Sequence, residues 1–230
     1  MPILKIAHRG ASGYALENSF EAFNKALRLS VDMIECDVRM CKSGELVLMH
    51  DRTIDRTTNQ KGIVSKLTLS QIKKIKLKNN EPIPSLEEIL IRYKDKTQIM
   101  IDIKSISAAP QIVKLVKKHQ CHNHILVAST LHPLLIDILI RDPAIQTAIS
   151  FDIYSYFKYI FVKKLFILPA KLVGAGIVNV YYKFVNKKIV EKAHKYGFKI
   201  NAYPPKTTEE INYLKQTGVD GIITNFPDKI

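Results

Sequence analysis

The sequence has few cysteines, fewer acidic than basic residues, and no long hydrophobic run without charges. Its three cysteines (Cys36, Cys41 and Cys121) are an odd number in a chain of 230 residues, which argues against a disulfide framework. No Pro/Gly/Ser-rich stretch, internal repeat or low-complexity segment divides it, so we expect one domain over residues 1–230. Three lysines and a proline interrupt the apolar stretch 160–178, which therefore does not match a membrane-spanning helix of about 20 apolar residues.

Residues 1–8 run directly into a strand-like segment, without the charged leader, apolar core and cleavage site of a signal peptide. We therefore expect a cytoplasmic protein. The 35 Lys and Arg residues exceed the 21 Asp and Glu residues, giving a formal charge of +14 that favours anionic partners. Because the lysines are dispersed and no nucleic-acid-binding motif accompanies them, we expect a solvated basic surface and no nucleic-acid partner.

Short apolar runs alternate with amphipathic segments along the chain, a pattern typical of parallel strands with helical connections. One helix is predicted to begin at Ser85, where Glu88 completes a capping box, and Gly197 and Gly218 are predicted to end two others. The predicted strands are residues 4–8, 33–38, 46–49, 98–103, 125–128, 146–151, 199–203 and 221–224. Eight strands in a chain of this length predict a TIM-type (β/α)8 barrel.

Three segments depart from this simple alternation. Residues 172–180 form a ninth strand candidate. The link between residues 38 and 46 is too short for the helical crossover that parallel strands usually need. Residues 51–84 exceed an ordinary connection, and we interpret them as a small insertion after the third strand.

The polar residues of the predicted strands point to a catalytic site. Side chains alternate across a strand, so Glu35 and Asp37 share one face of an otherwise apolar strand, and Asp102 and Lys104 share a face of another. Two carboxylates on a buried face repel each other unless a cation lies between them, and Mg²⁺ or Ca²⁺ is the natural partner. Histidines stand at the ends of the first and third strands, where barrel active sites are built.

In their order along the chain, these motifs resemble the signature of the glycerophosphodiester phosphodiesterase family: His8-Arg9-Gly10, Glu17-Asn18-Ser19, Glu35-Cys36-Asp37, His50-Asp51 and Asp102-Ile103-Lys104. The resemblance continues through residues 218–227 and so covers almost the whole chain. It implies a β/α barrel in which a small insertion corresponds to residues 51–84.

The resemblance implies that Glu35, Asp37 and Asp102 bind a divalent cation, either Mg²⁺ or Ca²⁺. It implies that His8 and His50 act as general acid and base. Both roles are chemically consistent, because imidazoles with a pKa near 6.5 exchange protons at neutral pH. The expected substrate is a small-molecule phosphodiester, cleaved to glycerol 3-phosphate and an alcohol.

Further roles follow from the same resemblance. Arg9 and Lys104 would contact the phosphate, and Glu17 would support the substrate or the site. The family usually has Glu where this chain has Asp102, which is shorter by one methylene. An aromatic segment of the family is replaced by residues 201–204, where Tyr203 offers an aromatic wall to the substrate.

Two other functions are compatible with the residues. The basic, aromatic stretch 151–182 would also suit a lysophospholipase D-like phosphodiesterase that acts on lysophospholipids at a membrane surface. A non-catalytic barrel that binds anions or nucleic acid would explain the charge but not the paired carboxylates. The departing alcohol, the metal and the oligomeric state stay open at this point.

Overall fold

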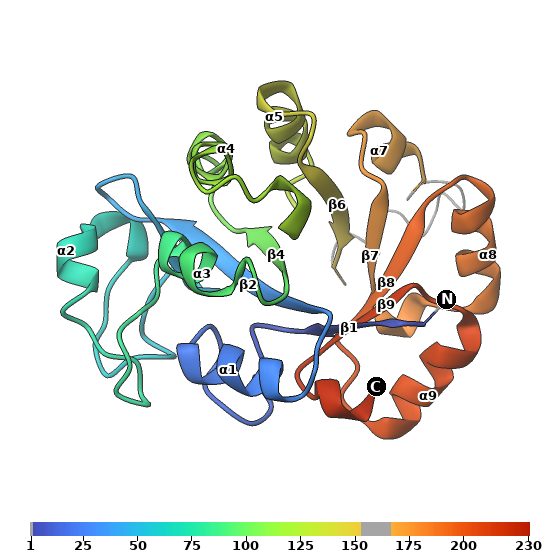
Figure 1. Cartoon of the computed structure of the whole chain (residues 1–230), viewed down its shortest axis with the longest axis horizontal. Helices are drawn as coiled ribbons and strands as arrows, with labels where there is room; N and C mark the ends of the chain where they lie inside the picture. Colours follow the sequence, from blue (N-terminus) through green and yellow to red (C-terminus); the bar gives the residue numbers. More distant parts are fainter. Residues whose placement is uncertain (1, 153–166) are drawn as a thin grey trace.

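The computed structural model describes residues 2–152 and 167–230, in which a closed ring of parallel strands is surrounded by helices (Figure 1). Within these residues eight strands form the ring, which closes because β1 pairs with both β2 and β9. In order around the ring, the strands are β1 (Leu4–Ala7), β2 (Met33–Met40), β4 (Gln98–Ile103), β5 (Ile125–Ser129), β6 (Gln146–Phe151), β7 (Ile177–Tyr181), β8 (Lys199–Tyr203) and β9 (Gly221–Thr224). The predicted (β/α)8 barrel is confirmed.

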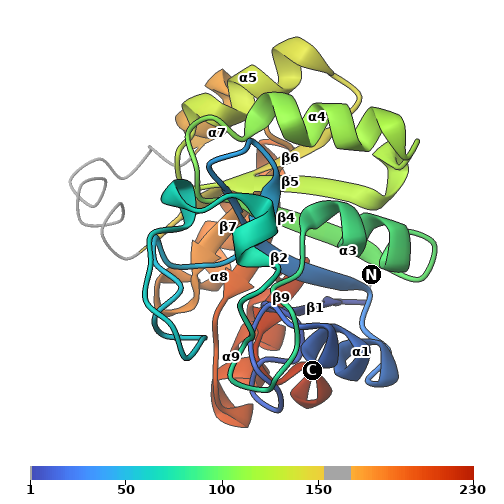
Figure 2. The same ribbon diagram turned by 90° about the vertical axis from the view of Figure 1, so that its left-hand side faces the viewer.

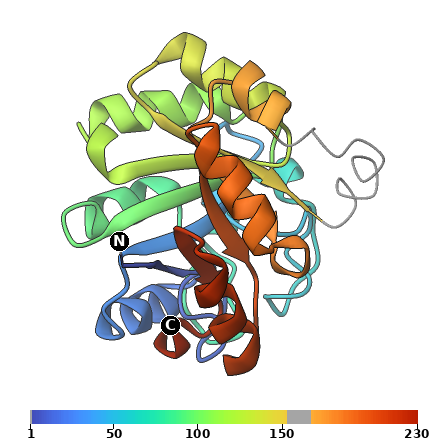
Figure 3. The same ribbon diagram turned by 90° about the vertical axis from the view of Figure 1, so that its right-hand side faces the viewer.

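Helices cover the outside of the ring, and the C-terminal ones, orange to red, lie over the side that Figure 3 presents. Ser85 and Glu88 form the predicted capping box, and Gly218 ends a helix in the left-handed conformation with φ of 81°. The described helices are α1 (Phe20–Arg28), α2 (Leu69–Ile72), α3 (Leu86–Tyr93), α4 (Ala109–Lys118), α5 (Pro133–Arg141), α7 (Ile167–Leu172), α8 (Lys187–Lys195) and α9 (Thr208–Thr217).

The strand prediction was wrong in one respect. The predicted strand 46–49 corresponds to β3 (Leu46–Leu48), which pairs antiparallel with β2 and lies outside the ring. The ninth candidate, residues 172–180, overlaps β7, which is a ring strand between β6 and β8. The short link before β3 explains the difference, because it suffices for a hairpin but not for a parallel crossover.

Alternation along the strands separates an inner from an outer core. On β4, Ile99, Ile101 and Ile103 join the large hydrophobic cluster between the ring and the helices. Met100 belongs to a second cluster that fills the ring, together with residues of β1, β5, β6 and β9. Asp102 follows Met100 by two residues, so it points the same way at the C-terminal end of the strand.

Residues between β3 and α3 lie outside the ring beside β2, where Figure 2 shows them in teal. They include a single 3-10 turn at Val64–Lys66 and the short α2. Ile54, Val64, Ile72 and Ile83 pack with neighbouring side chains into a hydrophobic cluster of their own. This small core holds the segment against the barrel, close to the C-terminal ends of β2 and β4.

Part of the basic, aromatic stretch expected to suit a membrane surface, residues 153–166, lies outside the described residues. The same holds for the first part of the apolar stretch 160–178. None of the helices in the described part of the chain has the length and apolar character needed to cross a membrane.

Candidate active site

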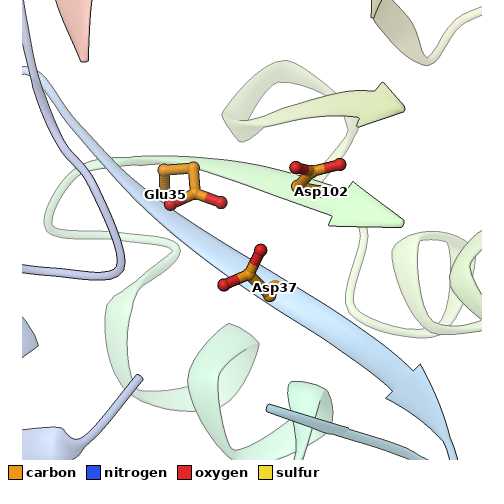
Figure 4. A group of neighbouring side chains, drawn as sticks. All are labelled: Glu35, Asp37 and Asp102. Atoms are coloured by element: carbon orange, nitrogen blue, oxygen red, sulfur yellow. The ribbon is translucent and has the colours of Figure 1, made fainter. Parts of the chain in front are cut away.

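Three carboxylates from two neighbouring strands lie together at the C-terminal end of the barrel. The alternation of β2 turns Glu35 and Asp37 to the same side, and the sheet register places Asp37 beside Asp102 of β4. Figure 4 shows the three carboxyl groups turned toward one another. One oxygen of each lies within 4.8 Å of the others, and both β2 carboxylates are buried. We call Glu35, Asp37 and Asp102 the carboxylate cluster.

The surroundings shift the pKa values of Glu35 and Asp37 in opposite directions. Burial raises the pKa of Glu35, and the nearby Asp37 and Asp102 raise it further. Burial also acts to raise the pKa of Asp37, but Lys104 and Arg9 outweigh it and hold this pKa well below its usual range. Asp102 Oδ1 is buried without a hydrogen-bond partner among the described residues. Crowded carboxylate oxygens, one of them unpartnered, fit a hard divalent cation such as Mg²⁺ or Ca²⁺.

Two cationic side chains contact the carboxylate cluster. Lys104 Nζ lies 2.7 Å from Asp102 Oδ2 and 3.3 Å from Asp37 Oδ1. Arg9 Nε lies 3.0 Å from Asp37 Oδ2. The backbone of Arg9 is left-handed, with φ of 57°, and its N–H donates to Glu35 Oε2 at 2.7 Å. Such a conformation is costly for a side-chain-bearing residue, so the surrounding contacts hold Arg9 in place at the site.

Each of the two predicted histidines is oriented through Nδ1. His8 Nδ1 lies 2.6 Å from Asn225 Oδ1, and His50 Nδ1 lies 2.8 Å from Asp51 Oδ1. When Nδ1–H donates to these oxygens, Nε2 of each ring is left to exchange protons with a substrate. Burial lowers the pKa of His8 to about 4, and the charge of Arg9 adds to the effect, so this ring is neutral at pH 7.

These side chains surround a pocket with a volume of about 230 Å³ at the mouth of the barrel. Asp37 does not line it but forms ion pairs with two residues that do. Glu17 also lies outside the lining, and accepts a hydrogen bond from Arg9 Nη1 at 3.1 Å. The predicted site residues that line the pocket are His8, Arg9, Glu35, His50, Asp102, Lys104 and Tyr203.

The rest of the pocket wall is polar on the side of β6 and β7. Asn179 donates from Nδ2 to Ser150 Oγ at 3.2 Å, and both residues line the pocket. Tyr203 packs edge-to-face against Tyr181, with ring centroids 6.4 Å apart. Burial raises the pKa of Tyr203, so its hydroxyl is neutral and can donate a hydrogen bond. Neither Ser150 nor Asn179 was predicted from the sequence.

Two arginines that the sequence analysis missed hold the site together. Arg56 donates to both oxygens of Glu17, at 2.7 and 2.8 Å, and to Asp51 Oδ2 at 2.7 Å. Arg39 donates to the carbonyl oxygen of His50 at 2.9 and 2.7 Å, and to that of Lys104 at 2.8 Å. Their partners are 5 to 65 residues away in sequence, so no local pattern indicated them.

Two asparagines were missed although a sequence signal existed. Asn18 belongs to a recognised motif and donates from Nδ2 to Asp37 Oδ2 at 2.9 Å, while its Oδ1 accepts from the backbone N–H of Asp37. Asn225 directly follows β9. A search of every strand end for polar residues would have identified Asn225, because barrel active sites gather there.

Comparison with known proteins identifies the same family that the sequence motifs resemble. Residues 8–229 match the model of the glycerophosphoryl diester phosphodiesterase family. A glycerophosphodiester phosphodiesterase of Caldanaerobacter subterraneus is 32% identical over 243 residues, covering 100% of this chain and 97% of the relative. A glycerophosphodiester phosphodiesterase of Bacillus subtilis is 30% identical over 251 residues, covering 98% of this chain and 84% of the relative.

Solved structures with lower sequence identity share the fold. An Oleispira antarctica phosphodiesterase in complex with the product sn-glycerol-3-phosphate superposes with a TM-score of 0.88 at 21% identity, covering 100% of this chain and 95% of that one. A glycerophosphodiester phosphodiesterase of Thermotoga maritima gives a TM-score of 0.83 at 24% identity, with 99% and 97% coverage. At such identities the structural likeness supports the barrel fold alone.

Proposed function

This chain belongs to the glycerophosphoryl diester phosphodiesterase family and is a phosphoric diester hydrolase, and we propose that it cleaves glycerophosphodiesters to sn-glycerol 3-phosphate and an alcohol. The observation that carries the proposal is that three carboxylates, two cations and two histidines meet at one pocket, which all of them except Asp37 line. A diester phosphate is anionic and needs both neutralisation and proton transfer to be cleaved, and this set of groups can supply both.

The carboxylate cluster is our candidate for a divalent-metal site. Glu35, Asp37 and Asp102 would hold Mg²⁺ or Ca²⁺, which when bound supplies positive charge that neutralises the phosphate oxygens. The unpartnered Oδ1 of Asp102 and the raised pKa of Glu35 support this assignment, because each reflects carboxylates crowded without sufficient positive charge.

In our proposal His8 and His50 act as the general acid–base pair. Their Nδ1 atoms are occupied by Asn225 and Asp51, so their Nε2 atoms would exchange protons with the attacking and leaving oxygens. The carboxylate of Asp51 accommodates the positive charge that the ring of His50 carries after it takes up a proton.

Arg9 and Lys104 would contact the phosphate from the side of the cluster, since both are cationic and both line the pocket. Glu17 would act through Arg9, because it lies outside the lining and contacts that guanidinium. Tyr203 would form a wall of the pocket against the rest of the substrate. These roles are consistent with electrostatic stabilisation of a phosphoryl transition state by prearranged cations.

The direct test is hydrolysis of a panel of glycerophosphodiesters, including glycerophosphocholine and glycerophosphoethanolamine, with released glycerol 3-phosphate measured enzymatically. We expect activity with Mg²⁺ or Ca²⁺, loss of activity with a chelator, and a loss of several orders of magnitude in the His8→Ala and Glu35→Gln variants. If the wild-type protein with either metal leaves the whole panel intact, the substrate assignment is wrong. If activity survives chelation unchanged, the metal assignment is wrong.

A further inference from the structure

A second depression lies beside the active-site pocket, with a volume of about 590 Å³. We call it the basic groove, because Arg39, Lys42, Arg52 and Lys104 line it and none of its described lining residues is acidic. A hollow that carries charge of one sign concentrates the electrostatic potential and attracts ions of the opposite sign.

The basic groove borders the active-site pocket along three successive loops. Lys104, after β4, lines both depressions. After β3, His50 lines the pocket and Arg52 lines the groove; after β5, Thr130 lines the pocket and Leu131 lines the groove. A ligand whose phosphate occupies the pocket therefore has the groove as its immediate neighbour on this side of the barrel mouth.

Three of the four cations that line the basic groove, all except Lys104, lack carboxylate ion-pair partners among the described residues. Within the described residues, Arg39, Lys42 and Arg52 form no ion pair, whereas Arg9 and Lys104 each contact carboxylates. In the described part of the chain the guanidinium of Arg39 donates to backbone carbonyl oxygens and forms no ion pair, while the charges of Asp37 and Asp51 act on it from a longer distance.

Two nearby carboxylates accept hydrogen bonds from residues outside the groove. Glu45 accepts from Ser43 at 2.5 Å, and Asp51 accepts from Arg56 at 2.7 Å. Neither lines the groove. The positive charge of the groove is therefore available to a ligand.

We propose that the basic groove binds a negatively charged group on the leaving alcohol of the substrate. The chemical class is a glycerophosphodiester whose alcohol carries a second phosphate or a carboxylate. The inference rests on the proposed function, because it places the scissile phosphate in the active-site pocket. The glycerol unit is uncharged and cannot use the cations of the groove, so the alcohol is the part of the substrate that they recognise.

Two matched substrates test the proposal: glycerophosphoglycerol, whose leaving glycerol is neutral, and bis(glycerophospho)glycerol, whose leaving group carries a second phosphodiester. The readout is the ratio of their kcat/KM values, corrected for the two equivalent ends of the larger molecule. We expect the wild-type enzyme to prefer the anionic alcohol, mainly through a lower KM, and the preference to decrease as salt screens the charges.

The variants Arg52→Glu and Lys42→Glu reverse single charges on exposed side chains. Each is expected to lower the ratio by about fivefold, the magnitude of one exposed ion pair. Lys61→Glu is the matched control: it makes the same exchange on an exposed lysine of the neighbouring segment outside the groove, and it should leave the ratio unchanged.

The outcomes separate the two proposals. If both substrates are cleaved and neither groove variant changes the ratio more than Lys61→Glu does, the groove proposal is overturned while the proposed function stands. If both rates fall equally, the groove lysine and arginine affect phosphate binding in general, and the proposal is again overturned. If the wild-type enzyme cleaves neither of these two substrates but cleaves others of the panel, the groove proposal is overturned while the proposed function stands. If it leaves the whole panel intact as well, both proposals fail.

Discussion

Replacing Arg56 by glutamine should reduce catalysis far more than it reduces stability. The Arg56 guanidinium joins Glu17 and Asp51, which in turn contact Arg9 and His50. Through these contacts Arg56, which lies in the segment between β3 and α3, helps to orient Arg9 and His50. Without it, both carboxylates lose a charged donor and the side chains that they hold can move.

The expected magnitudes follow from exposure and geometry. The Arg56 side chain is 49% exposed, and an exposed ion pair contributes up to about 1 kcal/mol, so the free energy of unfolding should change little. A displacement of about 1 Å in a catalytic group can cost about 100-fold in rate. We therefore expect kcat/KM to fall by roughly 10- to 100-fold. Arg56→Lys should recover only part of this, because an ammonium cannot reproduce the bidentate contact with Glu17.

The assay is steady-state hydrolysis of the best substrate of the panel, with the melting temperature of each variant measured in parallel. Arg141→Gln is the matched control, because Arg141 is 45% exposed and pairs with Asp137 on α5, away from the pocket. A value of kcat/KM for Arg56→Gln within twofold of that control would refute the positioning role. So would a loss of activity that simply tracks a loss of folded protein.

Three further predictions concern charge. Glu35→Gln removes one crowded carboxylate, so the chelator-treated protein should melt no lower than wild type, and millimolar Mg²⁺ or Ca²⁺ should no longer raise its melting temperature. The hydrogen bond from Arg56 lowers the pKa of Asp51 to about 2. The ionised Asp51 therefore stabilises the folded state fully above its unfolded pKa of about 4, and this contribution is lost as pH falls to about 2. Asp51→Asn should flatten the unfolding free energy across that interval, and an unchanged slope would contradict this. Asn225→Asp places a carboxylate at Nδ1 of His8, and NMR titration of chelator-treated protein should show its pKa rising from about 4; a fall would exclude the contact.

Much of the fold could be predicted because strand and helix signals are local. Seven of the eight predicted strands are ring strands, and the capping box at Ser85 lies where it was expected. The prediction was wrong at β3, which it counted as a ring strand, and it included β7 only as a ninth candidate, because the apolar pattern could not distinguish a short hairpin strand from a ring strand. Sheet pairing is decided by contacts between distant segments, which the pattern of one segment does not contain.

The sequence by itself determined the chemistry that the site can use. The motifs contain the carboxylates, histidines and cations of the site. Because side chains alternate along β2, Glu35 and Asp37 lie on the same face of that strand. These are properties of residue type and of spacing within one strand. They also suffice to identify the family.

Only the tertiary structure decided how these groups are held. The register of β2 against β4 sets Asp37 beside Asp102, and closure of the ring brings Asn225 to His8 across 217 positions. The arginines that tie the loops together and the unpaired cations of the basic groove arise in the same way. Such contacts depend on how remote segments pack, because electrostatic and hydrogen-bond energies are set by distance in space and by burial.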